Sequence, residues 1–292
     1  MTEPAGTVRT ADGLDLVLRA WPAPEPRGAI VLVHGLAEHT GRYAETAAHF
    51  AGLGWSVYAA DLRGHGLSPD GHRPGRVHVR RFSDYLLDVD AVREHAAARH
   101  GGQPLYVLGH SMGGLISLSY LLEHRGAFSG GVISSPALAP HPEALPPRRI
   151  VWIARLLSWL RPRTFFPSEV SPEVVCRDPE VVKAYAEDPL ISKTVSARWF
   201  IAMMKAMTAA HERAALLAEP VLLMQAGADR LVDPAAPARW AATTPAGQVD
   251  YVGWEGLYHE LLNEPEKDQV RARIAGWLEA RTAKADPGPP AA

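Results

Sequence analysis

Ser111 lies in a Gly-x-Ser-x-Gly pattern, Gly109-His110-Ser111-Met112-Gly113, whose surroundings favour a nucleophilic role. The apolar run 105–108 before it predicts a strand, and the apolar run 115–122 after it predicts a helix. A serine on so sharp a turn needs glycine on both sides because of crowding, and its hydroxyl stands clear of the sheet. The helix N-terminus that follows stabilises negative charge developing near the hydroxyl. The pattern therefore predicts a nucleophilic serine.

A serine hydroxyl is a weak nucleophile at neutral pH, so it needs a general base and a group that orients this base. Two later strand-like runs, 221–225 and 249–252, are followed by Asp229 and by His259. Serine, then acid, then histidine is one of the chain orders used by serine hydrolases. Asp233 is the alternative acid, but it lies farther from the end of its strand, so we prefer Asp229. The competing interpretation is structural: a turn serine, an aspartate that caps a helix and a surface histidine.

The oxyanion formed in such a reaction needs two backbone N–H groups aimed at it. One is expected from Met112, directly after the nucleophile, and the other from the loop 34–39 that follows an apolar run ending at Val33. Leu36 is our candidate in that loop, since His34-Gly35 permits a tight backbone turn. The same segment is also compatible with a simple strand-to-helix turn.

Neither a metal nor a cofactor is expected. His34, Glu38 and His39 lack the spacing of the H-x-x-E-H motif, and Asn263 stands where H-E-x-x-H, begun at His259, requires histidine. The sequence also lacks a Gly-rich dinucleotide or phosphate loop.

The elements that must position these residues alternate between strand-like and helical patterns. Strands buried on both faces are predicted by mostly apolar runs at 29–33, 55–59, 105–108, 131–134, 221–224 and 249–252. The alternating run 14–18 suits an edge antiparallel strand, and apolar residues between Phe82 and Val92 have helical spacing, with Gly101 ending that helix. This order predicts an α/β fold: a mostly parallel sheet with helices on both faces and functional groups at the carboxyl ends of its strands.

One region interrupts the alternation and divides the chain. We predict a first core segment over 1–136, a helical cap inserted over 137–218 and a second core segment over 219–282. The stretch 283–292 is rich in proline and alanine, which predicts a disordered tail.

Composition excludes several other classes of protein. Of 292 residues, 47% are hydrophobic and 21% charged, with a net charge of −2, so nucleic acid is not an expected partner. Cys176 is the only cysteine, and residues 1–7 lack the basic and apolar regions of a signal peptide. No apolar run reaches the roughly 18 residues of a membrane span. These features predict a cytoplasmic protein and give no sign of its oligomeric state.

Together these motifs resemble the monoacylglycerol lipases of the serine α/β-hydrolases over nearly the whole chain outside the tail. The specific matches are the runs 34–43, 61–68, 109–114, 177–185, 188–190, 227–233 and 258–260. Of these, 61–68 is shared widely among α/β-hydrolases, whereas 38–43 and the cap run 177–185 are more diagnostic. The resemblance implies an α/β-hydrolase fold with a mostly parallel eight-stranded sheet, helices on both faces and an inserted helical cap.

The resemblance also implies a small polar pocket for the glycerol head of the substrate. In that family the pocket draws on groups that match Glu38, Arg42, His110 and Tyr185. Glycerol hydroxyls need such donors and acceptors. The alternatives are that Glu38 and Arg42 form an ion pair pinning the oxyanion loop, and that His110 is a packed residue of the turn. Many relatives carry a smaller residue at the position of Leu36. The larger leucine side chain would narrow the entrance for the acyl chain.

The cap segment 148–161 is apolar, basic, free of acids and contains two tryptophans. Basic amphipathic helices of this kind lie on anionic lipid surfaces. The alternative is a helix packed over the active site with its arginines in water. In a lipid hydrolase the two roles are compatible, so we predict peripheral contact with a membrane surface through the cap.

The predicted function is hydrolysis of monoacylglycerols to fatty acid and glycerol through an acyl-enzyme. The first alternative is a broad carboxylesterase or lysophospholipase with the same triad. A prolyl aminopeptidase is less favoured, because no acidic cluster in the cap suits a free amino group. A non-catalytic binding protein of the same fold is the alternative from a different class.

Overall fold

The predicted strands assemble into one twisted sheet in the computed structural model, which describes residues 3–68, 76–145, 147–168 and 170–285. Within these ranges an eight-stranded sheet has the spatial order β1 (Gly6–Arg9), β2 (Asp15–Trp21), β4 (Trp55–Ala60), β3 (Gly28–Val33), β6 (Leu105–His110), β7 (Gly130–Ser134), β10 (Val221–Ala226) and β11 (Val249–Trp254). β1 and β2 pair antiparallel, as do β2 and β4, and all other neighbours are parallel. The carboxyl ends of β3, β6, β7, β10 and β11 therefore meet at one edge of the sheet, as predicted.

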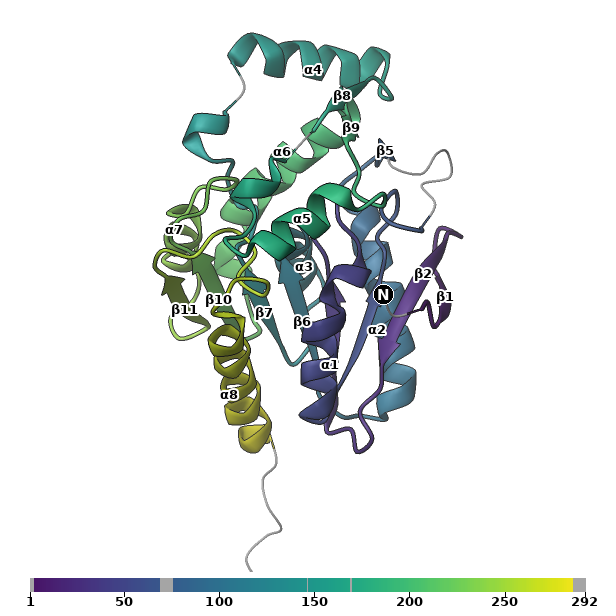
Figure 1. The fold of residues 1–292 in the computed structure, drawn as a ribbon, viewed down its shortest axis with the longest axis vertical. Helices are drawn as coiled ribbons and strands as arrows, with labels where there is room; N and C mark the ends of the chain where they lie inside the picture. Colours follow the sequence, from purple (N-terminus) through teal and green to yellow (C-terminus); the bar gives the residue numbers. More distant parts are fainter. Residues whose placement is uncertain (1–2, 69–75, 146, 169, 286–292) are drawn as a thin grey trace, which may run out of the picture.

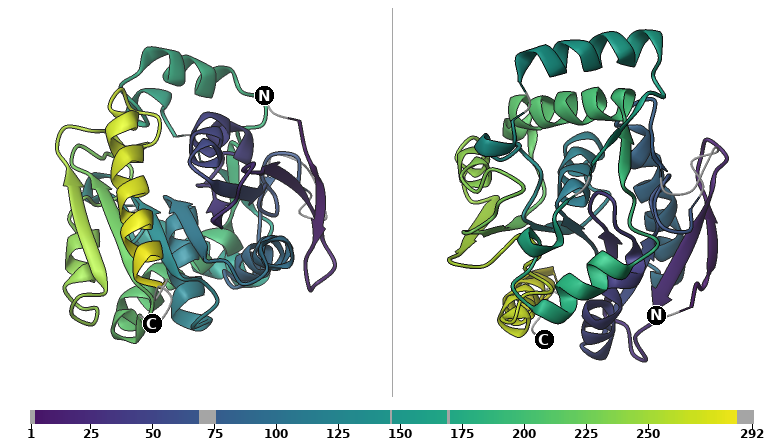
Figure 2. Two further views of the ribbon diagram at one scale, coloured as in Figure 1. Left: turned by 90° about the horizontal axis from the view of Figure 1, so that it is seen from below. Right: turned by 45° about the horizontal axis from the view of Figure 1, so that its top comes forward.

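Helices cover both faces of this sheet (Figures 1 and 2). The helices of the described chain are α1 (Ala44–Gly52), α2 (Asp84–His100), α3 (Met112–Glu123), α4 (Arg148–Leu160), α5 (Pro179–Glu187), α6 (Ala197–Glu212), α7 (Ala236–Ala241) and α8 (Lys267–Ala285). One core cluster joins the sheet to α1 and α8, and a second joins its other face to α2, α3, α6 and α7. The predicted α/β-hydrolase architecture is confirmed.

Two predictions about individual strands were wrong. β2 is not an edge strand, because the short strand β1 covers it through the hairpin 6–21. β11 is the edge strand at the other end of the sheet, and none of its residues is fully buried. By contrast, the predicted end of α2 at Gly101 is confirmed, since Gly101 has the left-handed φ of 45° that glycine adopts readily.

The region 137–218 carries α4, α5 and α6 above the carboxyl edge of the sheet, with α4 outermost and packed on α6 (Figure 2, right). A small second sheet joins this region to the core, in the order β5 (Arg76–Val77), β9 (Thr194–Ser196) and β8 (Phe165–Pro167). α8 ends at Ala285, three residues into the stretch for which a disordered tail is predicted, and 286–292 lie outside the described residues. The domain boundaries stay predictions.

Candidate active site

Ser111 lies on the sharp turn between β6 and α3, with φ 54° and ψ −118°. A Cβ atom at Gly109 would lie 2.5 Å from the carbonyl oxygen of Gly113, and one at Gly113 would overlap the carbonyl oxygen of Val33. The predicted crowding on both sides of the serine is therefore confirmed. This crowding explains why the strained turn at Ser111 requires glycine at 109 and 113.

The end of β7 holds the backbone of Ser111 in place. The Ser111 N–H donates to the carbonyl of Ser134 at 2.9 Å, and the Ser111 carbonyl accepts from the Ala137 N–H at 3.0 Å. These two hydrogen bonds join the turn to the next strand of the sheet. The hydroxyl is thereby held at the carboxyl edge, next to the loops after β10 and β11.

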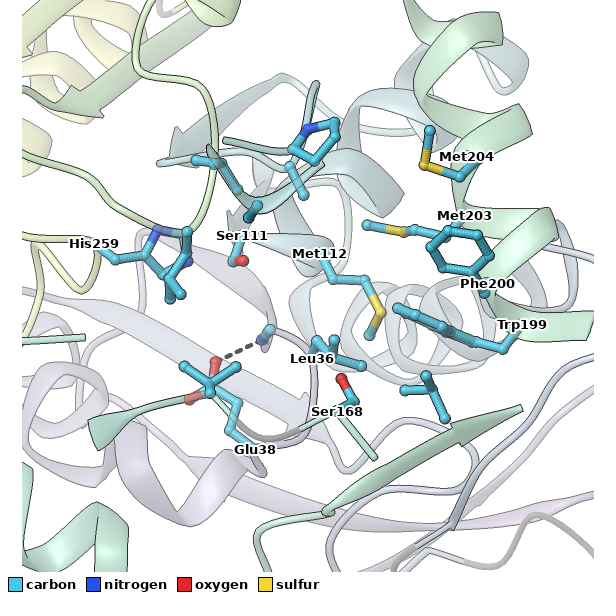
Figure 3. Close-up of a pocket in the computed structure, with 18 of the residues that line it drawn as sticks. Leu36, Glu38, Ser111, Met112, Ser168, Trp199, Phe200, Met203, Met204 and His259 are labelled. Carbon is cyan, nitrogen blue, oxygen red and sulfur yellow. Dashed lines mark hydrogen bonds between the residues drawn. The ribbon is translucent and has the colours of Figure 1, made fainter. Parts of the chain in front are cut away.

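The structure brings Asp229 and His259 together. Asp229 Oδ2 lies 2.7 Å from His259 Nδ1, and both side chains are buried. Asp229 also accepts from the backbone N–H groups of Leu231 and Val232 and from the Gln225 side chain. Because Nδ1 is bound to Asp229, Nε2 is the ring nitrogen that can act as the base. His259 lines the cavity, and Figure 3 shows its ring facing Ser111.

Charge partners set the protonation of this pair. Burial alone would lower the pKa of His259, but the carboxylate of Asp229 raises it above its ordinary value. Burial would likewise raise the pKa of Asp229, but the His259 ring and the backbone donors lower it. Asp229 therefore stays ionised and stabilises a protonated imidazole.

Asp233, the alternative acid, is engaged elsewhere. One of its oxygens accepts from the Ala235 N–H at 2.9 Å and the other from the Arg239 guanidinium at 2.6 Å. The structure therefore places this carboxylate in a surface ion pair and at the start of α7.

The two candidate oxyanion donors come from two segments of the chain, the start of α3 and the loop after β3. Met112 is the first residue of α3, so its N–H has no carbonyl four residues earlier in the helix to bond. Leu36 is in the loop after β3, where Ala37 has a φ of 69°. His34 Nε2 accepts from the Leu62 N–H at 2.9 Å, which ties this loop to the end of β4. Figure 3 shows Leu36 and Met112 bordering the same cavity.

Glu38 and Arg42 form a buried ion pair, the structural alternative considered above. Glu38 accepts from the Gly35 N–H and the Tyr43 hydroxyl at 2.6 Å each, and from Arg42 at 2.7 Å. Arg42 also donates to both carboxylate oxygens of Glu260, at 2.6 and 2.7 Å. Burial alone would raise the pKa of Glu38, but Arg42 and its other neighbours lower it to about 2. The network thus holds two ionised carboxylates and one guanidinium beside His259.

Glu260 is the site residue that sequence reasoning missed. Its carboxylate lines the cavity, is buried, and joins the histidine loop to Arg42. A signal was present, because this acid directly follows His259. A role in substrate binding could not be predicted, however, because only the folded chain brings Glu260 next to Arg42.

His110 and Tyr185 complete the polar end of the cavity. The rings of His110 and His259 have centroids 4.8 Å apart, and burial and His259 lower the pKa of His110 to about 4. Arg42 stacks over the Tyr185 ring at 4.8 Å. All four residues predicted for the glycerol pocket therefore lie together beside Ser111.

A cavity of about 540 Å³ extends from this polar end beneath the cap. Its far wall is apolar and comes largely from α6, through Trp199, Phe200, Met203, Met204 and Met207, while Ile150, Ile153 and Ala154 of α4 form its roof. Figure 3 shows the α6 side chains on the opposite side of Ser111 from His259. The site thus combines a charged, buried end with a long apolar compartment, which suits an amphiphilic ligand.

The part of the cap around α5 is joined directly to the core. Asp188 Oδ2 lies 2.8 Å from His39 Nε2, and the Ser192 N–H donates to the Ala37 carbonyl at 2.8 Å. The Glu260 N–H donates to the carbonyl of Val175 at 2.9 Å. These contacts attach the α5 region to the loops that carry the oxyanion candidate and the histidine.

Comparisons with known proteins identify similar sequences and structures. The serine aminopeptidase S33 family model matches residues 24–266. A monoacylglycerol lipase of Mycolicibacterium smegmatis is 38% identical over 91% of this chain and 93% of its own length, and the phospholipase YtpA of Bacillus subtilis is 33% identical over 86% and 94%. The crystal structure of Paleococcus ferrophilus monoacylglycerol lipase superposes with a TM-score of 0.82 at 31% identity, covering 91% of this chain and 99% of that one. The chain belongs to the S33 family of serine α/β-hydrolases, among its monoacylglycerol lipase-like members.

Proposed function

We propose that this protein hydrolyses monoacylglycerols to fatty acid and glycerol. The observation that carries the proposal is the cavity itself: Ser111 lies at the junction of a buried polar end and an apolar compartment. A single-chain glycerol ester has the same division, with its ester bond at the junction. Relatives over 30% identical along most of their length that are named monoacylglycerol lipase or monoglyceride lipase support this choice.

In the proposed mechanism, His259 removes the proton from Ser111 as the hydroxyl attacks the ester carbonyl. Asp229 holds the imidazole in the required tautomer and stabilises the imidazolium. The N–H groups of Met112 and Leu36 receive the oxyanion. His259 then protonates the departing glycerol, and a water molecule activated by the same histidine releases the fatty acid.

The polar end favours an uncharged head group. Glu38 and Glu260 are ionised, and Arg42 bridges them with one positive charge, so this end carries excess negative charge. Such a site accepts hydrogen bonds from glycerol hydroxyls and repels a phosphate ester. We propose Glu38, Arg42, His110 and Tyr185 as the residues that contact the glycerol.

The likeness to a phospholipase supports a second candidate, a lysophospholipase with the same chemistry. An aminopeptidase is less favoured, because both carboxylates near the serine are already paired with Arg42 rather than available to a free amino group.

The test is fatty-acid release from mono-, di- and triacylglycerols and lysophosphatidylcholine, with wild type and Ser111→Ala side by side. We expect release mainly from monoacylglycerols and none with the variant. Equal rates on all lipids would retain the nucleophile and refute the glycerol pocket. Activity that survives in Ser111→Ala would refute the mechanism.

We further propose that the enzyme is cytoplasmic and touches a membrane surface through α4. In the described part of the chain, no helix is long and apolar enough to cross a membrane. α4, however, exposes Trp152 (66%) and Trp159 (76%) together with Leu156 and Leu160, and carries exposed Arg148. Large apolar side chains beside arginines suit the boundary of an anionic bilayer.

The double variant Trp152→Ser/Trp159→Ser tests this contact. We expect slower hydrolysis of substrate in vesicles and weaker sedimentation with anionic liposomes, with unchanged turnover of a water-soluble ester. Leu53→Ser/Leu216→Ser, at apolar residues exposed outside α4, is the matched control. Unchanged sedimentation of the tryptophan variant would contradict the contact.

A further inference from the structure

A second groove lies on the opposite side of α6 from the active-site cavity. Two faces of α6 line different compartments: Trp199, Met203 and Met207 line the cavity, whereas Ala202 and Ala209 line the groove. α6 is therefore a wall shared by two compartments, and the second has no role in the proposed hydrolysis.

This second groove has an apolar floor. It has a volume of about 340 Å³ and is lined by small or aliphatic side chains of α2, α3 and α6, including Leu86, Leu122, Ile201, Ala206 and Ala210. About 16 Å of helix separates Arg198 from Ala209 at 1.5 Å per residue. This space suits one hydrocarbon chain lying along α6 and is too small for two.

A pocket of about 620 Å³ with strong positive charge shares Arg80, Arg81 and Arg198 with the groove. Five arginines line it, from three separate segments: Arg80, Arg81, Arg161, Arg163 and Arg198. No carboxylate is among the described residues that line it. Asp84, which lies close in the sequence to Arg80 and Arg81, is already bound by the Arg81 guanidinium and by two backbone N–H groups.

The groove contains little to neutralise this charge. Its one lining acid among described residues, Glu123, is bound by Arg213 at 2.7 Å. The Arg198 N–H donates to the Pro162 carbonyl at 3.3 Å, which holds the segment of Arg161 and Arg163 next to Arg198. Arginines that outnumber the neighbouring carboxylates repel one another, and a bound dianion relieves that repulsion.

We propose that this groove binds a single-chain lipid phosphate, with its phosphate among the arginines and its chain on the apolar floor. The excess of guanidinium groups over carboxylates at this pocket selects a dianionic phosphate monoester over a carboxylate. The volume of the groove admits one hydrocarbon chain. The same lipid is excluded from the catalytic end, where Glu38 and Glu260 repel phosphate.

Calorimetric titration of the full chain with dodecyl phosphate, below its micellar concentration, tests the proposal. The charge variant is Arg161→Glu/Arg163→Glu, on an exposed loop. Its matched control is Arg148→Glu/Arg149→Glu, with the same charge change at the other end of α4. Ala209→Trp blocks the floor without altering charge. We expect at least tenfold weaker binding in the charge and floor variants and none of this loss in the control.

Three further probes separate the sources of binding. Dodecyl glyceryl ether, with the same chain and no charge, should bind equally to wild type and to the charge variant, because it enters the catalytic cavity. Inorganic phosphate binding as tightly as dodecyl phosphate would overturn the role of the chain. Equal losses in the two arginine pairs, or binding seen only with phosphatidic acid vesicles, would overturn the groove as the site.

Discussion

Arg42 donates hydrogen bonds to both carboxylate oxygens of Glu260, the residue that follows His259 in the chain. The same guanidinium binds Glu38, which in turn holds the Gly35 N–H in the loop after β3. One side chain therefore connects the loop with the candidate oxyanion donor to the loop with the candidate base.

Replacing Arg42 by methionine should leave two buried carboxylates beside one another. We expect a loss of about 3–5 kcal/mol in the free energy of unfolding, because a buried charge loses its partner. The loss should shrink as the pH falls, since like-charge repulsion raises the carboxyl pKa values and protonation relieves it. Urea denaturation at pH 5 and pH 8 measures both effects. Arg42→Lys, which keeps the charge, should retain more stability; equal losses in both variants would argue against the charge explanation.

Asp229→Asn and Asp233→Asn should differ sharply in activity. Asp229 is hydrogen bonded to His259, so its amide variant should lower kcat by about 10⁴ through the wrong tautomer. Asp233 binds Arg239 on the surface, and its variant should retain nearly full activity. Steady-state kinetics on a soluble ester decide the matter; the opposite ranking would make Asp233 the acid.

The acid limb of kcat/KM should have its midpoint above pH 6.5. Neutral His259 is required as base, and Asp229 raises the pKa of this histidine above its ordinary 6.5 despite burial. In Asp229→Asn the charge is lost and burial dominates, so the midpoint of the residual activity should move below that of the wild type. A pH–rate profile on a soluble ester measures both; an unchanged midpoint would contradict the assignment.

The pKa shifts of Asp229 and His259 also predict how the free energy of unfolding depends on pH. Because folding raises the pKa of His259, its contribution is fully present below the unfolded value and disappears as the pH rises through the folded one. Because folding lowers the pKa of Asp229, its contribution is lost as the pH falls through that lower value. Asp229→Asn should therefore cost most stability between these limits, as thermal unfolding across pH will show.

Gly113→Ala should abolish activity and impair folding, because a Cβ there would overlap the Val33 carbonyl oxygen. Gly276→Ala is a control that should raise the stability rather than lower it. Nothing lies within 4 Å of a Cβ at Gly276 in α8, so alanine should add about 1 kcal/mol of stability. Thermal unfolding distinguishes the two, and a tolerated Gly113→Ala would refute the crowding at the turn.

Much of the sheet could be predicted because parallel strands buried on both faces are apolar along their length. β1 was missed since only Val8 is buried in it, although Asp12-Gly13 is a hairpin signal. β5, β8 and β9 contain two or three residues each, too few to show a period. Such strands depend on tertiary pairing.

The candidate site also has a part that the sequence predicts and a part that it does not. Ser111, Asp229 and His259 each follow a predictable strand, so their meeting at one edge could be expected. The apolar wall could not, because α6 is apolar on two faces and only packing decides that Met203 faces the cavity and Ala206 the groove.

The two parts of the cap are attached in different ways, and this has an evolutionary consequence. The α5 region is fastened to the catalytic loops through His39–Asp188 and Ala37–Ser192, whereas α4 packs on α6. Mutations in α4 can therefore reshape the compartment for the hydrocarbon chain without disturbing the reacting groups. Chain-length preference can drift between relatives, or be exchanged by grafting α4, while the chemistry is inherited unchanged.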